Sequence, residues 1–146
     1  MLNVSYRTEY AIRALVTLAE HWEKPPVGLS RIAVQKDVSF KYLEQLMMAL
    51  RKAGLVKAMR GRTGGYSLTR PPAAITLAEV LDVLEGPVQI RDCAPSDHAC
   101  KFSKDCLVKY LWREMERSLV TILKNRTLAD LVPGNGNKAR AGVAKA

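Results

Sequence analysis

The stretch that most constrains the fold is a short run of arginines and glycines between two apolar segments. Residues 60–65 read Arg-Gly-Arg-Thr-Gly-Gly and separate residues 55–59 from residues 66–68. Short apolar segments bounded by glycine-rich turns are typical of β-strands. Glycine supplies the positive φ angles that a tight connection between paired strands requires. The sequence therefore predicts a β-hairpin with two arginines at its tip.

Helices are predicted ahead of this hairpin. The first covers residues 5–20, and Pro25 and Pro26 close it off, since proline cannot continue a helix. A second helix begins at Ser30, a residue type that caps helix N-termini, and stops near residues 36–37. The apolar residues that we expect it to turn inward are Ile32, Ala33 and Val34.

A third helix is predicted over residues 40–52, with Ser39 as its N-cap and Gly54 at its end. Its apolar residues recur at helical spacing and are expected to face the core: Phe40, Leu43, Leu46, Met47 and Leu50. Its outer face is polar and charged: Lys41, Tyr42, Glu44, Gln45, Arg51 and Lys52. A merely solvated helix has such a face too, so this helix alone leaves its role open.

Two short helices joined by a turn form a helix-turn-helix, and a hairpin after it makes a winged helix. The expected fold is mainly α with a small β-hairpin wing. The net charge of +9 is uneven: residues 1–72 hold twelve Lys/Arg against five Asp/Glu, and residues 73–146 hold eleven against nine. Residues 40–70 hold seven bases against one acid. We therefore expect the third helix to enter the major groove of duplex DNA, while Arg60 and Arg62 reach phosphates or the minor groove.

The second half of the chain predicts two further helices and a tail. Thr76 and Glu79 form a capping box that starts a helix ending near residue 85. Residues 107–125 form a long helix, and 127–132 add one or two turns. A heptad seam on the long helix is expected to pair two subunits in a homodimer, rather than to pack on the chain's own body: Val108, Trp112, Met115, Leu119 and Ile122. The expected organisation is a DNA-binding region over 1–86, a cysteine loop over 87–106, a dimerisation helix and terminal turn over 107–132, and a disordered basic tail over 133–146.

The three cysteines of the chain, Cys93, Cys100 and Cys106, lie in one polar stretch. An odd number argues against a disulfide framework. No signal peptide is recognisable and no apolar run approaches the roughly 20 residues of a membrane span, so the cytoplasm is the expected compartment, with no membrane partner. Clustered thiols in a loop suit soft metals or an iron–sulfur cluster, and the absence of close Cys-x2-Cys pairs favours a cluster over zinc. Ordinary or redox-active thiols are the alternative.

These motifs together resemble the IscR/NsrR-like family of iron–sulfur winged-helix transcriptional regulators. The resemblance covers residues 1 to about 132. It is carried by Tyr-Ala-Ile-Arg-Ala-Leu at 10–15, Tyr-Leu-Glu-Gln-Leu at 42–46, Leu-Arg-Lys-Ala-Gly-Leu-Val at 50–56, the wing at 60–66, the three cysteines before Leu-Trp at 111–112, and Thr-Leu-Ala-Asp-Leu-Val at 127–132.

The resemblance implies a homodimeric repressor or activator that binds a double-stranded operator and holds a 2Fe-2S or 4Fe-4S cluster on Cys93, Cys100 and Cys106. It also implies a set of residues at the DNA: Ser39, Lys41, Tyr42, Glu44, Gln45, Arg60 and Gly61. Arg51, on the outer face of the third helix, and Arg62, at the tip of the hairpin, are expected at the DNA from their positions in the sequence. Glu44 suits a cytosine amino group and Gln45 an adenine. Oxygen or nitric oxide is the expected signal.

The fourth cluster ligand is the point where this chain departs from the family. Cluster-assembly repressors carry a histidine three residues past the last cysteine, whereas this chain has Lys109, whose protonated amine is no ligand. Nitric-oxide sensors use a carboxylate of the first helix, and Glu9 occupies the matching position. We therefore expect Glu9, from the partner subunit, as the fourth ligand, unless it pairs instead with Arg13. His98 is its competitor, and weaker ones are Asp92, Asp97 and Asp105. The gap between the first two cysteines is one residue longer than in these relatives, which leaves cluster nuclearity open.

Two other functions compete with this prediction. A cluster-free winged-helix regulator would carry the same three thiols idle or redox-active. An iron–sulfur electron carrier or enzyme is disfavoured, because the chain has only His21 and His98 and lacks a glycine-rich nucleotide motif and a nucleophile–base pair. We accordingly expect no enzymatic activity.

Overall fold

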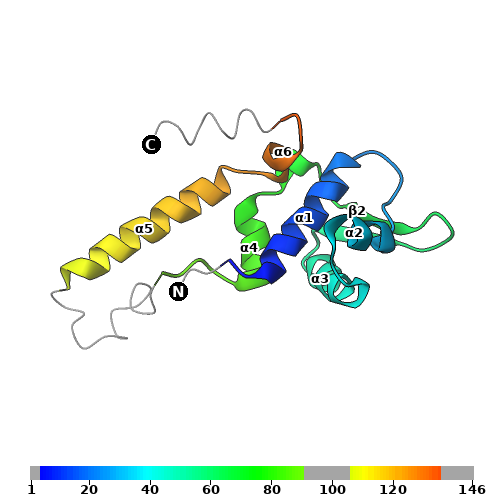
Figure 1. Ribbon diagram of the computed structural model, residues 1–146. Helices are drawn as coiled ribbons and strands as arrows, with labels where there is room; N and C mark the ends of the chain where they lie inside the picture. Colours follow the sequence, from blue (N-terminus) through cyan, green and yellow to red (C-terminus); the bar gives the residue numbers. More distant parts are fainter. Residues whose placement is uncertain (1–3, 91–105, 136–146) are drawn as a thin grey trace.

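The computed structural model describes residues 4–90 and 106–135. In these ranges a helical body carries a hairpin at one end, and a long helix reaches away at the other (Figure 1). The elements in chain order are α1 (Tyr6–Glu20), α2 (Leu29–Lys36), α3 (Phe40–Lys52), β1 (Val56–Met59), β2 (Gly65–Leu68), η1 (Pro72–Ala74), α4 (Leu77–Glu85), α5 (Leu107–Lys124) and α6 (Leu128–Leu131). The predicted class, mainly α with a two-stranded wing, is confirmed.

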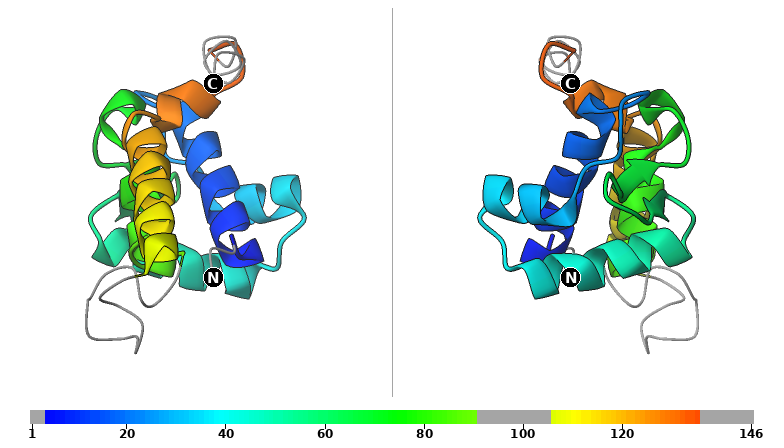
Figure 2. Two further views of the ribbon diagram at one scale, coloured as in Figure 1. Left: turned by 90° about the vertical axis from the view of Figure 1, so that its left-hand side faces the viewer. Right: turned by 90° about the vertical axis from the view of Figure 1, so that its right-hand side faces the viewer.

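Helix α1 is the central element of the core. Its N-cap, Ser5, accepts the N–H of Thr8. Four apolar side chains on one face of α1 are at most 1% exposed: Ala11, Ala14, Leu15 and Leu18. Helices α2, α3, α4 and α6 and strand β2 all pack against α1, and Figure 2 shows α3 crossing beneath its first turns. Each large aliphatic side chain buried here contributes about 1.5–3 kcal/mol of hydrophobic stabilisation.

Helix α2 begins earlier than the sequence predicts, and one of its apolar residues faces solvent. Its N-cap is Gly28 rather than Ser30, with the N–H groups of Arg31 and Ile32 donating to the Gly28 carbonyl. The reason is that Leu29 is buried and so belongs to the helix. Val34 is 83% exposed, because Leu29, Ile32 and Ala33 already fill the inward stripe of this short helix.

The turn into α3 uses a left-handed aspartate, Asp37, with φ +50°. This conformation is one that Asp tolerates better than most residues. The inner face of α3 is the predicted one at four positions, each at most 2% exposed: Leu43, Leu46, Met47 and Leu50. Phe40, predicted to join them, is instead 47% exposed. It lies about 70° around the helix from the centre of that stripe.

The hairpin pairs Val56 with Leu68 and Met59 with Gly65 in antiparallel register. A segment before α2 extends it, because Val27 and Tyr66 exchange backbone hydrogen bonds of 2.9 Å in both directions. The open end of the hairpin, where Val56 pairs with Leu68, is buried in the body. The wing is therefore attached to the body through three chain segments rather than through its two strands alone.

The second half of the chain leaves the body through α4 and returns through α6. The predicted capping box of Thr76 and Glu79 is present at the start of α4. At the return, Leu77 N–H donates to the Arg126 carbonyl at 2.8 Å and Leu128 N–H to the Ile75 carbonyl at 3.0 Å. Leu128 is fully buried. Within residues 4–90 and 106–135, no helix is long and apolar enough to cross a membrane.

Candidate nucleic-acid interface

The exposed face of α3 is held in a fixed orientation by its two ends. Ser39 Oγ accepts the N–H of Tyr42 at 3.2 Å, as predicted for the N-cap. Gly54, with φ +77°, turns the chain after the last helical residues. Opposite the buried stripe, five of the predicted side chains are exposed: Lys41, Glu44, Gln45, Arg51 and Lys52. Hydrogen-bonding groups at helical spacing on a rigid element are what base-edge readout in a major groove requires.

Tyr42 differs from these neighbours because it is half-buried. Its ring meets that of Tyr10 edge to face, with centroids 6.3 Å apart and planes at 88°. Such a pair contributes roughly 0.5–1.5 kcal/mol beyond the area it buries. The ring of Tyr42 therefore joins α3 to α1.

Glycines shape the wing and leave its arginines in solvent. A Cβ on Gly64 would lie 2.3 Å from the Met59 carbonyl oxygen, and one on Gly65 would lie 2.4 Å from that of Val27. Neither position has room for a side chain. Three predicted DNA-binding residues at the tip, Arg60, Gly61 and Arg62, are all exposed, at the end of the molecule opposite the start of α5 (Figure 1).

Most bases of this region are available to a polyanion. Arg70 is the exception, since its guanidinium donates to Glu79 Oε1 at 3.0 Å. The Thr76 backbone N–H and, more weakly, this guanidinium lower the pKa of the Glu79 carboxyl, while burial opposes them. In the part of the chain that the structure describes, no carboxylate lies within 4 Å of the other six bases of residues 40–70: Lys41, Arg51, Lys52, Lys57, Arg60 and Arg62.

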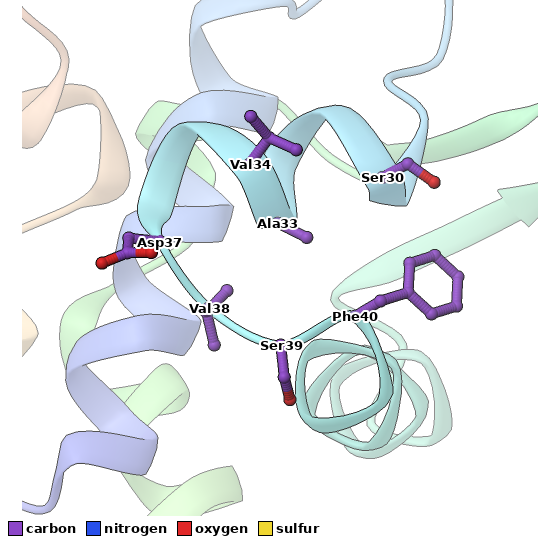
Figure 3. A pocket seen from close by; sticks show the side chains of 7 residues that line it. All are labelled: Ser30, Ala33, Val34, Asp37, Val38, Ser39 and Phe40. Atoms are coloured by element: carbon purple, nitrogen blue, oxygen red, sulfur yellow. The ribbon is translucent and has the colours of Figure 1, made fainter.

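An open groove separates α2 from the first turn of α3. Its volume is about 700 Å³, and it is lined by Ser30, Ala33, Val34, Asp37, Val38, Ser39 and Phe40. Figure 3 shows the Phe40 ring projecting at one rim and Val34 standing on the outer side of α2. The groove lies to one side of the outer face of α3. Phe40, at the rim of the groove, is therefore on the side of α3 that faces α2.

Helix α5 exposes an apolar stripe that nothing in the described part of the chain covers. Val108, Leu111, Met115 and Ile122 are 44–57% exposed. Trp112 and Leu119, the other two members of the predicted seam, are half-buried, because they lie between this stripe and the face that packs on α4. Leu111 was not predicted. Its spacing of three from Val108 and four from Met115 is the signal that identifies it.

The cysteine loop is represented in the structure by its last member. Cys106 is half-buried and is the N-cap of α5. Lys109, one turn on, is 7% exposed, and its Nζ lies 5.9 Å from the ring centroid of Tyr110. The start of a helix favours negative charge, which suits a thiolate ligand at Cys106. The other predicted ligands and competitors lie outside the described residues: Cys93, Cys100, His98, Asp92, Asp97 and Asp105. Among the described residues, no three His, Cys, Asp or Glu side chains converge into a metal site.

Glu9 lies on the surface of α1 in an ion pair with Arg13, the alternative that its spacing also predicted. The side chains are 45% and 52% exposed. A pair this exposed is worth less than about 1 kcal/mol. The pairing therefore does not prevent Glu9 from taking another partner.

A carboxylate that the sequence gave no reason to single out joins the end of α4 to the start of α1. Glu85 Oε1 accepts from the hydroxyls of Ser5 and Thr8, and from the Ser5 N–H at 3.3 Å. These hydrogen bonds, the Ser5 hydroxyl first, lower the pKa of Glu85. Thr8 is fully buried, so Glu85 satisfies a hydroxyl that water does not reach. Because the partners are about 80 residues apart, no local sequence signal could have revealed the contact.

A family model described as "Rrf2: Iron-dependent Transcriptional regulator" matches residues 4–134 of this chain. The chain belongs to the Rrf2 family. The predicted family is thereby confirmed at this level, and the chain is a helix-turn-helix transcriptional regulator with a winged helix that binds DNA.

Three relatives illustrate the range of Rrf2 proteins that this chain is similar to. A putative HTH-type transcriptional regulator, ORF2 of Azotobacter vinelandii, is 37% identical over 131 residues, which are 90% of this chain and 79% of that protein. The structure of T. potens IscR is 34% identical, covers 99% of this chain and 92% of its own, and has a TM-score of 0.72. The structure of CymR, the global cysteine regulator of B. subtilis, is 36% identical, covers 90% and 96%, and has a TM-score of 0.73. The chain is therefore similar to IscR and to CymR to about the same degree.

Proposed function

We propose that this Rrf2 protein is a homodimeric regulator whose affinity for a duplex operator is set by an iron–sulfur cluster. The observation that carries the proposal is the place of Cys106. Cys106 is the N-cap residue of α5, the helix whose apolar stripe is left uncovered by residues 4–90 and 106–135. A ligand to the cluster and the face that pairs two subunits therefore belong to one rigid element, so occupancy of the cluster can alter how the subunits are held.

The residues proposed to hold the cluster are Cys93, Cys100 and Cys106, with Glu9 of the partner subunit as fourth ligand and His98 as its competitor. When bound, a cluster ties its ligands together and responds to oxygen or nitric oxide. Glu9 can serve because its pair with Arg13 is exposed and weak.

We assign DNA contact to the exposed face of α3 and to the wing. The proposed contacts are Ser39, Lys41, Tyr42, Glu44, Gln45, Arg51, Arg60, Gly61 and Arg62. In a dimer, two copies of α3 must meet half-sites about one turn of DNA apart. Their separation is set by the way the two α5 helices pair.

The dimer face that we propose comprises Val108, Leu111, Met115 and Ile122, with Trp112 and Leu119 at its edge. Leu111→Asp places a charge inside this stripe. We expect it to shift the sedimenting species from dimer to monomer at micromolar concentration. Thr121→Asp, an exposed position on the same helix but off the stripe, is the matched control and should remain dimeric. A dimeric Leu111→Asp protein would show that another face pairs the subunits.

A continuous set of contacts connects this dimer helix to the DNA reader. Helix α5 packs on α4, and Glu85 at the end of α4 holds Ser5 and Thr8 at the start of α1. Two residues after Thr8 along α1, Tyr10 packs on Tyr42 of α3. We propose this route as the path by which a change at the cysteine loop alters the placement of α3.

The test is anaerobic reconstitution, with iron and acid-labile sulfide assays and visible absorption, followed by a gel-shift titration on a duplex selected by the protein from a random-sequence library. The wild type should carry a coloured cluster, and its affinity for this duplex should change at least tenfold when the cluster is removed. Cys100→Ala should have the cluster-free affinity under both conditions, and Ser103→Ala, in the same loop, should behave as wild type. Equal affinity of wild type with and without the cluster would refute the switch.

A second candidate is a cluster-free regulator whose thiols are redox-active or idle. Similarity to CymR, of which one solved structure is described as an oxidized form, favours it. Iron-free protein prepared without oxygen decides between the two. If it binds the duplex as tightly as the reconstituted protein and loses affinity on treatment with diamide, the thiols themselves are the switch. If neither treatment changes affinity, the thiols are idle.

A further inference from the structure

The apolar residues of α3 fall into two groups. Leu43, Leu46, Met47 and Leu50 are at most 2% exposed and belong to the core. Met48 is 61% exposed, although it directly follows the buried Met47 in sequence. A methionine in this position adds nothing to the core of the subunit.

Met48 points in the same direction as the residues assigned to the DNA. On a helix of 3.6 residues per turn, it lies about 15° from the mean direction of Lys41, Glu44 and Gln45. Phe40, the other exposed apolar residue of α3, lies about 95° from that direction and borders the groove toward α2 (Figure 3). Met48 is thus at the centre of the outer face, whereas Phe40 is on its flank.

The surroundings of Met48 would bring it against a polyanion. Lys41 and Lys52 lie on the same stripe, seven residues before it and four after it, and both are exposed. A long helical side chain leans toward the helix N-terminus, so the Met48 thioether lies over the turn that carries Glu44 and Gln45. Those two residues present polar groups, and Met48 presents a flexible apolar one between them.

We propose that Met48 is a specificity-determining residue that contacts the 5-methyl group of a thymine in the major groove. That methyl is the one apolar group on the major-groove edges of the four bases, and apolar side chains recognise it. The proposal deepens the proposed DNA-binding function, since it takes the outer face of α3 as the reader. It predicts a thymine next to the base pairs that Glu44 and Gln45 contact, once in each half-site.

The experiment measures affinity for the library-selected duplex with each thymine replaced singly by uracil, which removes only the methyl. Wild-type protein should lose about threefold to fivefold in affinity at one position of each half-site. Met48→Ala should bind the thymine and uracil duplexes equally. Met48→Leu, which keeps an apolar side chain of similar size, should still distinguish them, and so should Phe40→Ala. Because Met48 is exposed, its variants should unfold at the wild-type temperature, which circular dichroism checks.

Two results would overturn the assignment: no uracil effect in the wild type, or a Met48→Ala protein that keeps it. A Gln45→Ala variant separates this failure from failure of the proposed interface. If Gln45→Ala weakens binding while Met48→Ala leaves the thymine preference intact, α3 reads the DNA but Met48 does not. If neither substitution changes binding, the outer face of α3 is not the reader.

Discussion

Gly65→Ala should destabilise the protein by breaking the connection between the wing and the body. A Cβ at this position would lie 2.4 Å from the Val27 carbonyl oxygen and 2.5 Å from its carbon, so the backbone must separate. Those atoms belong to the bridge in which Val27 and Tyr66 exchange two hydrogen bonds of 2.9 Å. Each such bond contributes about 1 kcal/mol net. Losing both should lower the free energy of unfolding by about 2 kcal/mol, a large fraction of the roughly 5–15 kcal/mol that holds a domain together.

Urea denaturation followed by circular dichroism measures this change, with the midpoint shifting and the slope unchanged. Gly28→Ala is the control in the same bridge region, because Gly28 has φ −64° and nothing lies within 4 Å of its added Cβ. As a helix N-cap it should cost less than about 1 kcal/mol. If Gly65→Ala is as stable as wild type, the Val27–Tyr66 bridge is not what fixes the wing. Gly65→Ala should also lose DNA affinity, because the tip of the wing is then no longer held against the body.

Two further predictions concern the hydrogen bonds of Glu85 and the exposed arginines of the wing. Hydrogen bonds from Ser5 and Thr8 lower the pKa of Glu85, so their stabilisation is present above the ordinary pKa near 4.5 and is lost as pH falls through the lowered value. Glu85→Gln should therefore flatten the loss of stability below pH 4.5 in acid titrations monitored by fluorescence, and an unchanged profile would contradict the contact. Replacing Arg60 and Arg62 together by Ala should weaken binding to all duplexes alike and reduce the slope of log affinity against log salt by about 2, whereas a loss confined to one sequence would assign the wing to base readout.

Local signals predicted the elements of this fold, and tertiary packing decided the details that they missed. Ser39 and Thr76 cap α3 and α4 as their residue types indicate. Ser30 fails as the cap of α2 because burial of Leu29 starts the helix earlier. Phe40 has the residue type of a core position but lies too far around α3 to reach it. In each wrong prediction, the chemistry of one residue was outweighed by the geometry of its neighbours.

The candidate site was predictable to the extent that it follows helical spacing. The outer face of α3 was read from sequence in this way, and the exposed arginines of the wing from the glycine-rich turn between two apolar segments. The same spacing would have added Leu111 to the α5 stripe and Met48 to the α3 face. The Glu85 contact and the Tyr10–Tyr42 pair were not predictable, because each joins elements whose relative placement depends on the whole core.

In the proposed switch, the anchoring of α5 would let a small change at the cysteines affect DNA binding at the other end of the molecule. The chain after α5 is fixed to the body by the hydrogen bonds of Leu77 to Arg126 and of Leu128 to Ile75. The opposite end of the helix begins at Cys106 and reaches away from the body (Figure 1). A helix of 18 residues is about 27 Å long. A rotation of about 10° around the fixed end would therefore displace the Cys106 end by about 5 Å. Since α5 carries the proposed dimer face, such a rotation in both subunits would change the separation of the two α3 helices by a distance comparable to one base-pair step or more, and half-sites one turn apart would no longer be met together.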